Sequence, residues 1–222
     1  MPDPSPTRIV PIWDPWVRVV HWAIVVLFAV SVASGLAHRL DLHFASGYAL
    51  LALVLFRIAW GIVGSETARF RSFLRGPRAV LDSLAGFLKR TPDHSPGHSA
   101  AGGWSVAALL LLLLAQAGTG LFADDAIFTR GPLARLVPPA VSDTATWLHL
   151  RLWMALAAMV ALHVLAVALY ALLRRTDLIG PMITGRKRLP PGTRPPTMGS
   201  PWLAAALMIA AAAAVWGISR LG

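Results

Sequence analysis

Residues 147–173 read WLHLRLWMALAAMVALHVLAVALYALL, an almost uninterrupted apolar run that holds two histidines and one arginine. At about 1.5 Å per residue, a helix of this length exceeds the roughly 30 Å hydrocarbon core of a membrane. Shorter stretches of the same character are residues 17–37, 44–64, 104–123 and 202–219. Such segments must be helical in lipid, because no water satisfies their backbone. The sequence therefore predicts an all-α integral membrane protein, with a four-helix bundle and a fifth, C-terminal transmembrane helix.

The composition supports this class and excludes others. Of the 222 residues, 56% are hydrophobic and only 14% are charged, whereas soluble domains average about 25% charged residues. This balance argues against a disordered chain and against an ordinary water-soluble enzyme. The sequence has no cysteine, which excludes disulfides, thiolate nucleophiles, cysteine-held iron–sulfur clusters and covalent c-type haem.

The formal net charge is +10, and most of the positively charged residues lie in the segments between the spans. Loop 65–103 and the basic, Pro- and Gly-rich linker 174–201 hold most of the arginines and lysines, so the positive-inside rule places both, with the N-terminal tail 1–16, in the cytoplasm. Five spans then place the C-terminus outside. Topology explains the charge, so we expect no nucleic-acid partner. We expect an interfacial helix that starts at residues 75–77 and runs through Val80, Leu81, Leu84 and Leu88. We also expect a linker that separates the last span from the first four.

Seven histidines are present, and their positions indicate a site within the spans. Two of them, His94 and His98, lie in the cytoplasmic loop, where we expect solvated side chains. The other five lie in or at the edges of spans: His21, His38, His43, His149 and His163. An ionisable residue in a membrane is costly and by default functional, although a single histidine can also serve as a hydrogen bond between helices.

His149 and His163 share one face of the fourth span. They are 14 residues apart, so at about 100° per residue their directions differ by only about 40°. The rise of about 1.5 Å per residue separates them by about 21 Å along the helix. One therefore lies near the outer boundary, and the other lies deeper, toward the cytoplasm.

Each of these histidines has a partner at matching depth on another span. His21 lies about one turn inside the first span, at the depth expected of His163. His43 begins the second span at the outer boundary, level with His149. His38, in the short outer turn, is the alternative outer ligand. We favour His43 because it adjoins the second span.

Two facing imidazoles in an apolar bundle match the needs of haem iron. Zinc usually takes four ligands and would need two further donors at each level, whereas a porphyrin leaves only two axial positions for the protein. Helical bundles commonly hold cofactors in their cores. We therefore predict two non-covalent b haems, with His21 and His163 on the inner iron and His43 and His149 on the outer iron.

Three further residues are candidates for haem binding. Gly35 and Gly47 would let a flat macrocycle approach the backbone, although small residues also serve ordinary helix packing. Arg57 lies 14 residues after His43, on the same face and at the inner level. It would pair with a haem propionate there, unless it snorkels to the interface.

The motifs around these histidines resemble those of bacterial cytochrome b561 proteins. The resemblance rests on WDP (13–15), RVVHW (18–22), LHFASGY (42–48) and the spacing of His149 and His163. The stretch FRIAWG (56–61) is also similar to the cytochrome b subunit of membrane-bound nickel–iron hydrogenases. The resemblance covers about residues 10–189 and leaves the fifth span outside it.

The resemblance implies a di-haem cytochrome in the inner membrane of a bacterium. It would carry electrons in a respiratory chain between the quinone pool and a redox partner protein, such as a c-type cytochrome, a hydrogenase or a dehydrogenase. We then expect an electron-transfer subunit of an oxidoreductase rather than a stand-alone enzyme, and we leave open a bound quinone and a homodimer. Bis-histidine ligation leaves no open position on the iron, which favours electron transfer over chemistry at the metal.

Two alternative functions stay open. One is a self-sufficient quinone reductase fed by superoxide at the outer face, where Arg39, Arg130 and Arg135 would attract the anion. The other belongs to a different class: a haem-free, proton-coupled transporter that uses the histidines as a proton relay.

Overall fold

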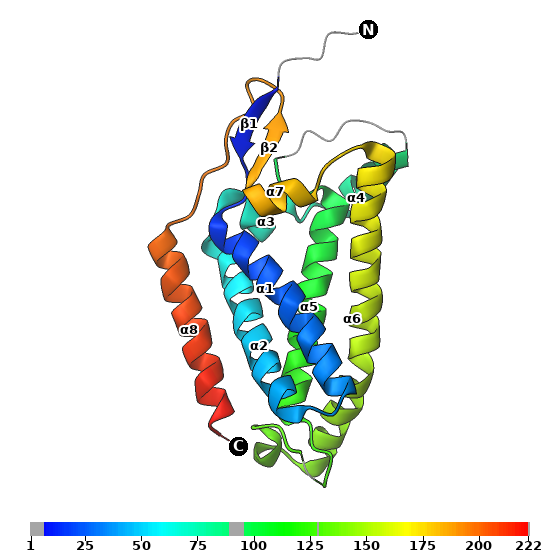
Figure 1. The fold of residues 1–222 in the computed structure, drawn as a ribbon, viewed down its shortest axis with the longest axis vertical. Helices are drawn as coiled ribbons and strands as arrows, with labels where there is room; N and C mark the ends of the chain where they lie inside the picture. The colour runs from blue at the N-terminus through cyan, green and yellow to red at the C-terminus, as the bar shows by residue number, and fades with distance from the viewer. Residues whose placement is uncertain (1–6, 89–95, 128, 222) are drawn as a thin grey trace. The chain divides into compact units, whose positions relative to one another are not determined.

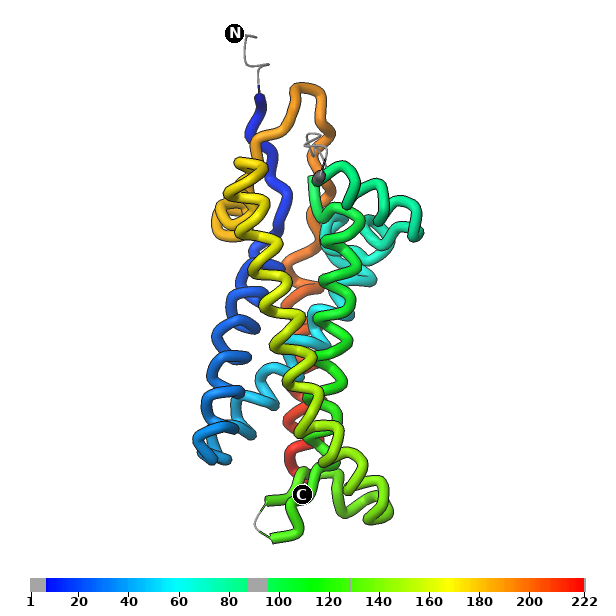
Figure 2. Tube along the Cα trace, turned by 90° about the vertical axis from the view of Figure 1, so that its right-hand side faces the viewer, coloured from blue at the N-terminus to red at the C-terminus, as the bar shows by residue number. Residues whose placement is uncertain are grey.

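A computed structural model describes residues 7–88, 96–127 and 129–221, and its longest elements are five α-helices. Their bounds are α1 Pro15–Leu36, α2 Leu40–Val63, α5 Ala100–Phe122, α6 Pro139–Arg174 and α8 Pro201–Ser219. Each is long and apolar enough to cross a membrane, and α6 runs as one continuous helix (Figure 2). The predicted all-α membrane fold is confirmed. α6 begins at Pro139 instead of Trp147, because proline fits the first helical position, where no N–H is needed.

Shorter elements lie in the segments between the long helices. They are η1 Glu66–Ala68, α3 Phe70–Phe73, α4 Pro77–Leu88, η2 Ala134–Leu136 and α7 Ile179–Thr184. α4 is the helix that we predicted to start at residues 75–77. The last residue of α6, Arg174, donates hydrogen bonds to the carbonyl oxygens of Gly86 (2.9 Å) and Phe87 (2.6 Å). These bonds satisfy two of the carbonyl groups that the C-terminal end of α4 leaves unpaired.

The N-terminal tail and the linker together form a small sheet that the sequence did not predict. Strand β1 (Arg8–Pro11) pairs antiparallel with β2 (Arg186–Leu189), with Val10 opposite Lys187 (Figure 1). Val10 and Leu189 are buried. Strands of four residues carry little sequence signal, because a strand is stabilised only by its partner, which here lies far away in the chain.

The chain divides into two compact units. Unit 1 consists of Met1–Val19, Ala59–Ala107 and Leu162–Ala204, and unit 2 consists of Val20–Ile58, Ala108–Ala161 and Ala205–Gly222. In unit 2, four helices meet in one apolar core. Its buried members are Val54 of α2, Leu113 of α5 and Leu156 of α6. Ile24 and Phe28 of α1 pack against them.

The fifth span also packs within unit 2. Val215 of α8 is only 3% exposed and clusters with Leu51 and Ala52 of α2. Leu114 and Ala117 of α5 pack against the same cluster. Our expectation that the linker separates the last span from the first four is therefore wrong. Small side chains on α2, α5 and the Ala-rich α8 allow the helices to approach each other closely.

Asp14 connects the start of α1 with α2 in unit 1. Its Oδ1 accepts a hydrogen bond from the Val17 N–H (2.9 Å), and its Oδ2 accepts one from the indole N–H of Trp60 (3.1 Å). The carboxylate is buried, and Pro15 occupies the first position of α1. Asp14 is thus the N-cap of this helix, which gives the WDP motif a structural role.

Gly185 joins the end of α7 to the segment before α1. Its carbonyl oxygen accepts hydrogen bonds from the N–H groups of Ile12 (2.8 Å) and Trp13 (3.1 Å). Its φ is +79°, and an added Cβ would lie 2.8 Å from the carbonyl oxygen of Trp13. Both the backbone conformation and the close approach therefore require glycine.

His98 differs from the sequence prediction. Its ring lies 4.8 Å from that of Trp13 and 5.0 Å from that of Phe73, measured between centroids, and the residue is half-buried. The expected solvated side chain is wrong for His98, because aromatic rings from two other segments of unit 1 cover it. His94 lies outside the described residues.

Candidate functional site

Two of the predicted ligands, His43 and His149, lie next to each other in unit 2. His43 is in the first turn of α2 and His149 is in α6. Their ring centroids are 6.0 Å apart, with an interplanar angle of 84°, and both residues are half-buried. His38, the alternative to His43, is exposed in the turn before α2 and has a left-handed φ of 54°. The pair that the structure brings together is the one that the helix depths predict.

Each of the two rings is held through its Nδ1 atom. His43 Nδ1 lies 2.8 Å from the carbonyl oxygen of Ser31 in α1, and His149 Nδ1 lies 2.9 Å from that of Gln116 in α5. A carbonyl oxygen can only accept a hydrogen bond, so Nδ1 of His43 carries the hydrogen. The Gln116 carbonyl is the nearest partner of His149 Nδ1 and favours the same tautomer in that ring. The lone pair of each neutral imidazole is then on Nε2, the nitrogen that remains for a metal.

A glycine lies against each ring. A Cβ added to Gly35 would lie 3.0 Å from His43 Nδ1, and one added to Gly120 would lie 2.9 Å from His149 Cε1. Each glycine comes four residues after the carbonyl acceptor of the same ring. One turn of α1 and one turn of α5 therefore each provide a hydrogen-bond acceptor and the space for an imidazole. Gly35 was predicted near this level, whereas Gly120 was missed.

Gln116 is a second residue that the sequence reasoning missed. Its side-chain Nε2 donates a hydrogen bond to the backbone carbonyl of His149 (3.1 Å), and it lies 3.2 Å from Nδ1 and 3.5 Å from Nε2 of the same histidine. Its Oε1 is buried and has no hydrogen-bond partner among the residues that the structure describes. A polar residue in the otherwise apolar third span was the available signal. This span has no histidine.

The residues around this pair fit a haem. With a metal–nitrogen bond of about 2 Å at each ring, and each nitrogen about 1 Å from its ring centre, imidazoles on opposite sides of one metal have centroids roughly 6 Å apart. A Cβ added to Gly47, one turn after His43, would meet no atom within 4 Å, so space is open there. Within the described residues, no three His, Asp or Glu side chains converge. This donor set suits a cofactor that needs only two protein ligands.

The other predicted ligands lie in different units. His21, in unit 2, has its ring centroid 5.0 Å from that of its neighbour Trp22, and His163, in unit 1, is half-buried. Their pairing therefore stays a prediction. Arg57 is 6% exposed, so it does not extend to the surface as a snorkelling side chain would.

One of the outer arginines is part of an ion pair. Arg130 Nε lies 2.6 Å from Asp124 Oδ2, in the segment between α5 and α6. The Oγ1 of Thr146 accepts a hydrogen bond from the Asp124 N–H (2.9 Å), which holds the acidic partner in place. The positive charge of Arg130 is thus partly neutralised, which weakens the case for a superoxide-binding outer surface.

Comparisons with known proteins identify the family. A family model described as prokaryotic cytochrome b561 matches residues 12–185. The comparison with curated proteins gave no match. The matched residues include the four predicted iron ligands and end before α8. Because the match covers well over half of a chain with membrane-spanning helices, this chain belongs to the prokaryotic cytochrome b561 family, the membrane-bound b-type cytochromes of electron transfer.

Proposed function

We propose that this chain is a di-haem b-type cytochrome that carries electrons across the bacterial inner membrane, between the quinone pool and a redox partner protein. The observation that carries the proposal is the pair formed by His43 and His149. Their rings lie 6.0 Å apart, and the Nδ1 of each lies within hydrogen-bond distance of a backbone carbonyl. Family membership supports electron transfer by a membrane cytochrome b.

The protein prepares these two ligands before any metal binds. The carbonyl groups of Ser31 and Gln116 favour the tautomer with a lone pair on Nε2 and restrict rotation of each ring. They also make each imidazole a stronger donor to a metal. A haem held here by His43 and His149 would supply a one-electron redox couple.

We assign the second haem to His21 and His163 at the inner level. The support is the agreement of their depths, since His163 lies about 21 Å along the helix from His149. Arg57 is buried and, by residue count, lies at the inner level, so we assign it to a propionate of this haem. Two haems at two depths would connect the two faces of the membrane.

The proposed orientation places both basic segments in the cytoplasm and the C-terminus outside. It rests on the arginines and lysines of residues 65–103 and 174–201. Alkaline phosphatase fused to the C-terminus should be active outside the cytoplasm, and a fusion within residues 65–103 should be inactive. The reverse pattern would contradict the orientation and the assignment of inner and outer haems.

Haem stoichiometry tests the proposed function. The purified full-length chain should contain two extractable b haems, measured by the pyridine haemochromogen spectrum and protein concentration. His149→Ala should retain one haem. His38→Ala is the matched control, because this exposed histidine lies near His43 in sequence, and it should retain both. One haem or none in the unchanged chain would contradict the proposal. A colourless protein would favour the transporter.

A further inference from the structure

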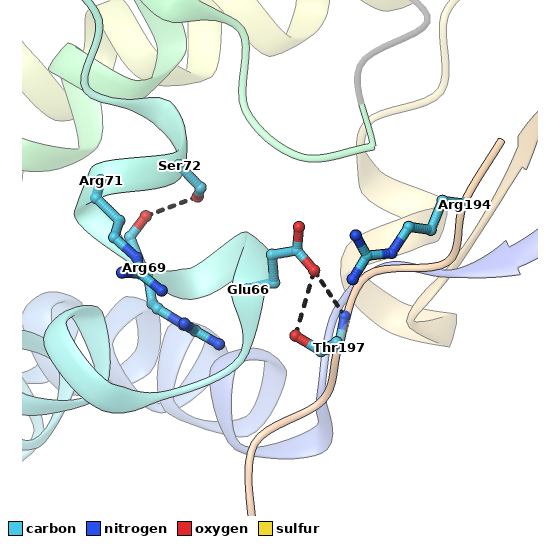
Figure 3. Close-up of a pocket in the computed structure, with 6 residues that line it drawn as sticks. All are labelled: Glu66, Arg69, Arg71, Ser72, Arg194 and Thr197. Atoms are coloured by element: carbon cyan, nitrogen blue, oxygen red, sulfur yellow. Dashed lines mark hydrogen bonds between the residues drawn. The ribbon is translucent and has the colours of Figure 1, made fainter.

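An open pocket of about 420 Å³ lies in unit 1. Its lining residues are far along the sequence from His163, the proposed haem ligand in the same unit. Its lining comes from two segments far apart in the chain: Glu66, Arg69, Arg71 and Ser72 after α2, and Arg194 and Thr197 before α8 (Figure 3). Backbone hydrogen bonds hold the two segments together, including one from the Glu66 N–H to the Thr197 carbonyl (2.9 Å). The pocket is therefore a built feature of this unit.

The pocket carries an excess of positive charge. Its lining holds three arginines and one carboxylate, that of Glu66. The Oε2 of Glu66 already accepts hydrogen bonds from the N–H (2.9 Å) and Oγ1 (3.2 Å) of Thr197. Within the part of the chain that the structure describes, none of these arginines has an ion-pair partner. Arg69 is held in place, because its Nε donates to the carbonyl of Gly64 (2.8 Å). With three guanidinium groups and one carboxylate in its lining, the pocket has a net positive charge.

The position of the pocket along the chain places it at the membrane boundary. α2 ends at Val63, just before Glu66, and α8 begins at Pro201, just after Thr197. Large apolar side chains near these helix ends are exposed: Ile62 (66%), Val63 (50%), Trp202 (83%) and Leu203 (41%). An exposed tryptophan at a helix end is typical of the interface between membrane and water. A basic pocket thus lies in sequence beside apolar surfaces that suit acyl chains.

We propose that this pocket binds the phosphate group of an anionic membrane lipid. Arginine binds phosphate through a planar fork of N–H donors, and basic pockets beside transmembrane helices bind lipid head groups. Inorganic phosphate offers the same charged group but makes no use of the exposed apolar side chains. The lipid satisfies both parts of the site, so the lipid is the ligand that we assign.

Titration of the full-length chain with phosphatidylglycerol tests the assignment. Native mass spectrometry in mild detergent measures bound lipid, with phosphatidylcholine as the neutral lipid. Removing one arginine near a membrane surface should weaken binding about fivefold, so Arg71→Gln/Arg194→Gln should weaken it about 25-fold. Arg78→Gln/Arg188→Gln removes two exposed arginines from the same two segments, outside the pocket, and should leave binding unchanged. Phosphatidylcholine should bind weakly to all three proteins.

Two results would overturn the proposal. Equal affinity of both double variants for phosphatidylglycerol would show that general surface charge, not the pocket, attracts the lipid. Binding of inorganic phosphate as tight as that of phosphatidylglycerol, with no loss on Trp202→Ser, would assign the pocket to a soluble anion instead. The number of bound haems reports whether each variant is folded. If a double variant does not fold, Arg71→Gln and Arg194→Gln singly, each about fivefold weaker, provide the same test.

Discussion

The ring of His43 lies 6.0 Å from the ring of His149, and the Nδ1 of each lies within hydrogen-bond distance of a carbonyl group on another helix. His43 belongs to α2 and His149 to α6, while the acceptors Ser31 and Gln116 belong to α1 and α5. Two imidazoles thus connect four helices of unit 2. The geometry of the candidate site therefore depends on the packing of the whole bundle.

The first prediction concerns which histidines share an iron. His43→Ala and His149→Ala should each lose the same haem, because one metal needs both rings. His21→Ala and His163→Ala should each lose the other haem, because about 21 Å separates the two levels. Low-temperature difference spectra of the four purified variants distinguish the two haems. If His21→Ala and His149→Ala lost the same haem, the depth argument would be wrong.

The second prediction uses two glycines of one helix. Gly120→Ala should weaken the outer haem, because the new Cβ would lie 2.9 Å from His149 Cε1 and displace the ring. Changes beside a metal ligand typically cost about 10–100-fold in affinity. Gly118→Ala is the control, since its Cβ would meet no atom within 4 Å. Haem titration of both variants measures the difference, and equal affinities would contradict the role assigned to Gly120.

The third prediction concerns the buried carboxylate of Asp14. Asp14→Ala removes the N-cap of α1, worth about 0.5–2 kcal/mol, and also removes the hydrogen bond from the Trp60 N–H, worth about 0.5–1.5 kcal/mol or more because its acceptor is charged. Thermal unfolding followed by circular dichroism should show a clear loss of stability. Asp41→Ala removes an exposed carboxylate from the first turn of α2 and should change stability little. Similar losses in both variants would contradict the buried connection.

The fourth prediction is a pH dependence at Glu66. Hydrogen bonds from Thr197, aided by the charges of Arg194 and Arg69, hold the pKa of Glu66 below its usual value. A carboxylate with a lowered pKa in the folded state stabilises the fold above its unfolded pKa, and this contribution is lost as pH falls through the folded pKa. Residues 190–200 should therefore exchange amide hydrogens faster in acid, after correction for the intrinsic rate.

Glu66→Gln provides the control for this pH effect. The variant lacks the titrating carboxylate, so it should show faster exchange of residues 190–200 already at neutral pH and no further loss in acid. Asp82→Asn removes an exposed carboxylate elsewhere in unit 1 and should behave as the unchanged protein. Unchanged pH dependence in Glu66→Gln would show that another group controls the segment.

The fifth prediction concerns α8. A chain truncated after Pro190 should retain both haems, because all four proposed ligands precede this residue. Its melting temperature should fall by roughly 2–8 °C, because the contacts of Val215 with Leu51 and Ala52 are lost. Haem content and thermal unfolding of the truncated chain check both statements. Loss of both haems would show that α8 is essential to the bundle.

The sequence by itself determined the membrane fold and the family, and it predicted that His43 and His149 lie at one level. Apolar runs long enough to cross a membrane can only be helices there, and the constant rise of a helix gives the depth of every residue in it. The prediction that His43 and His149 occupy one level followed from counting residues alone. The WDP and RVVHW motifs pointed to the family that the match over residues 12–185 shows.

Only the tertiary structure decided what surrounds these histidines. Gln116 and Ser31 act on the rings through backbone carbonyl groups, which every residue has, so the sequence does not show which carbonyl accepts a hydrogen bond from which ring. Gly120, the strand pair β1–β2 and the packing of α8 depend on contacts between segments far apart in the chain. Such contacts are set by how each helix is rotated about its axis when it packs. Hydropathy gives the span of a helix in the membrane, whereas interlocking side chains determine this rotation.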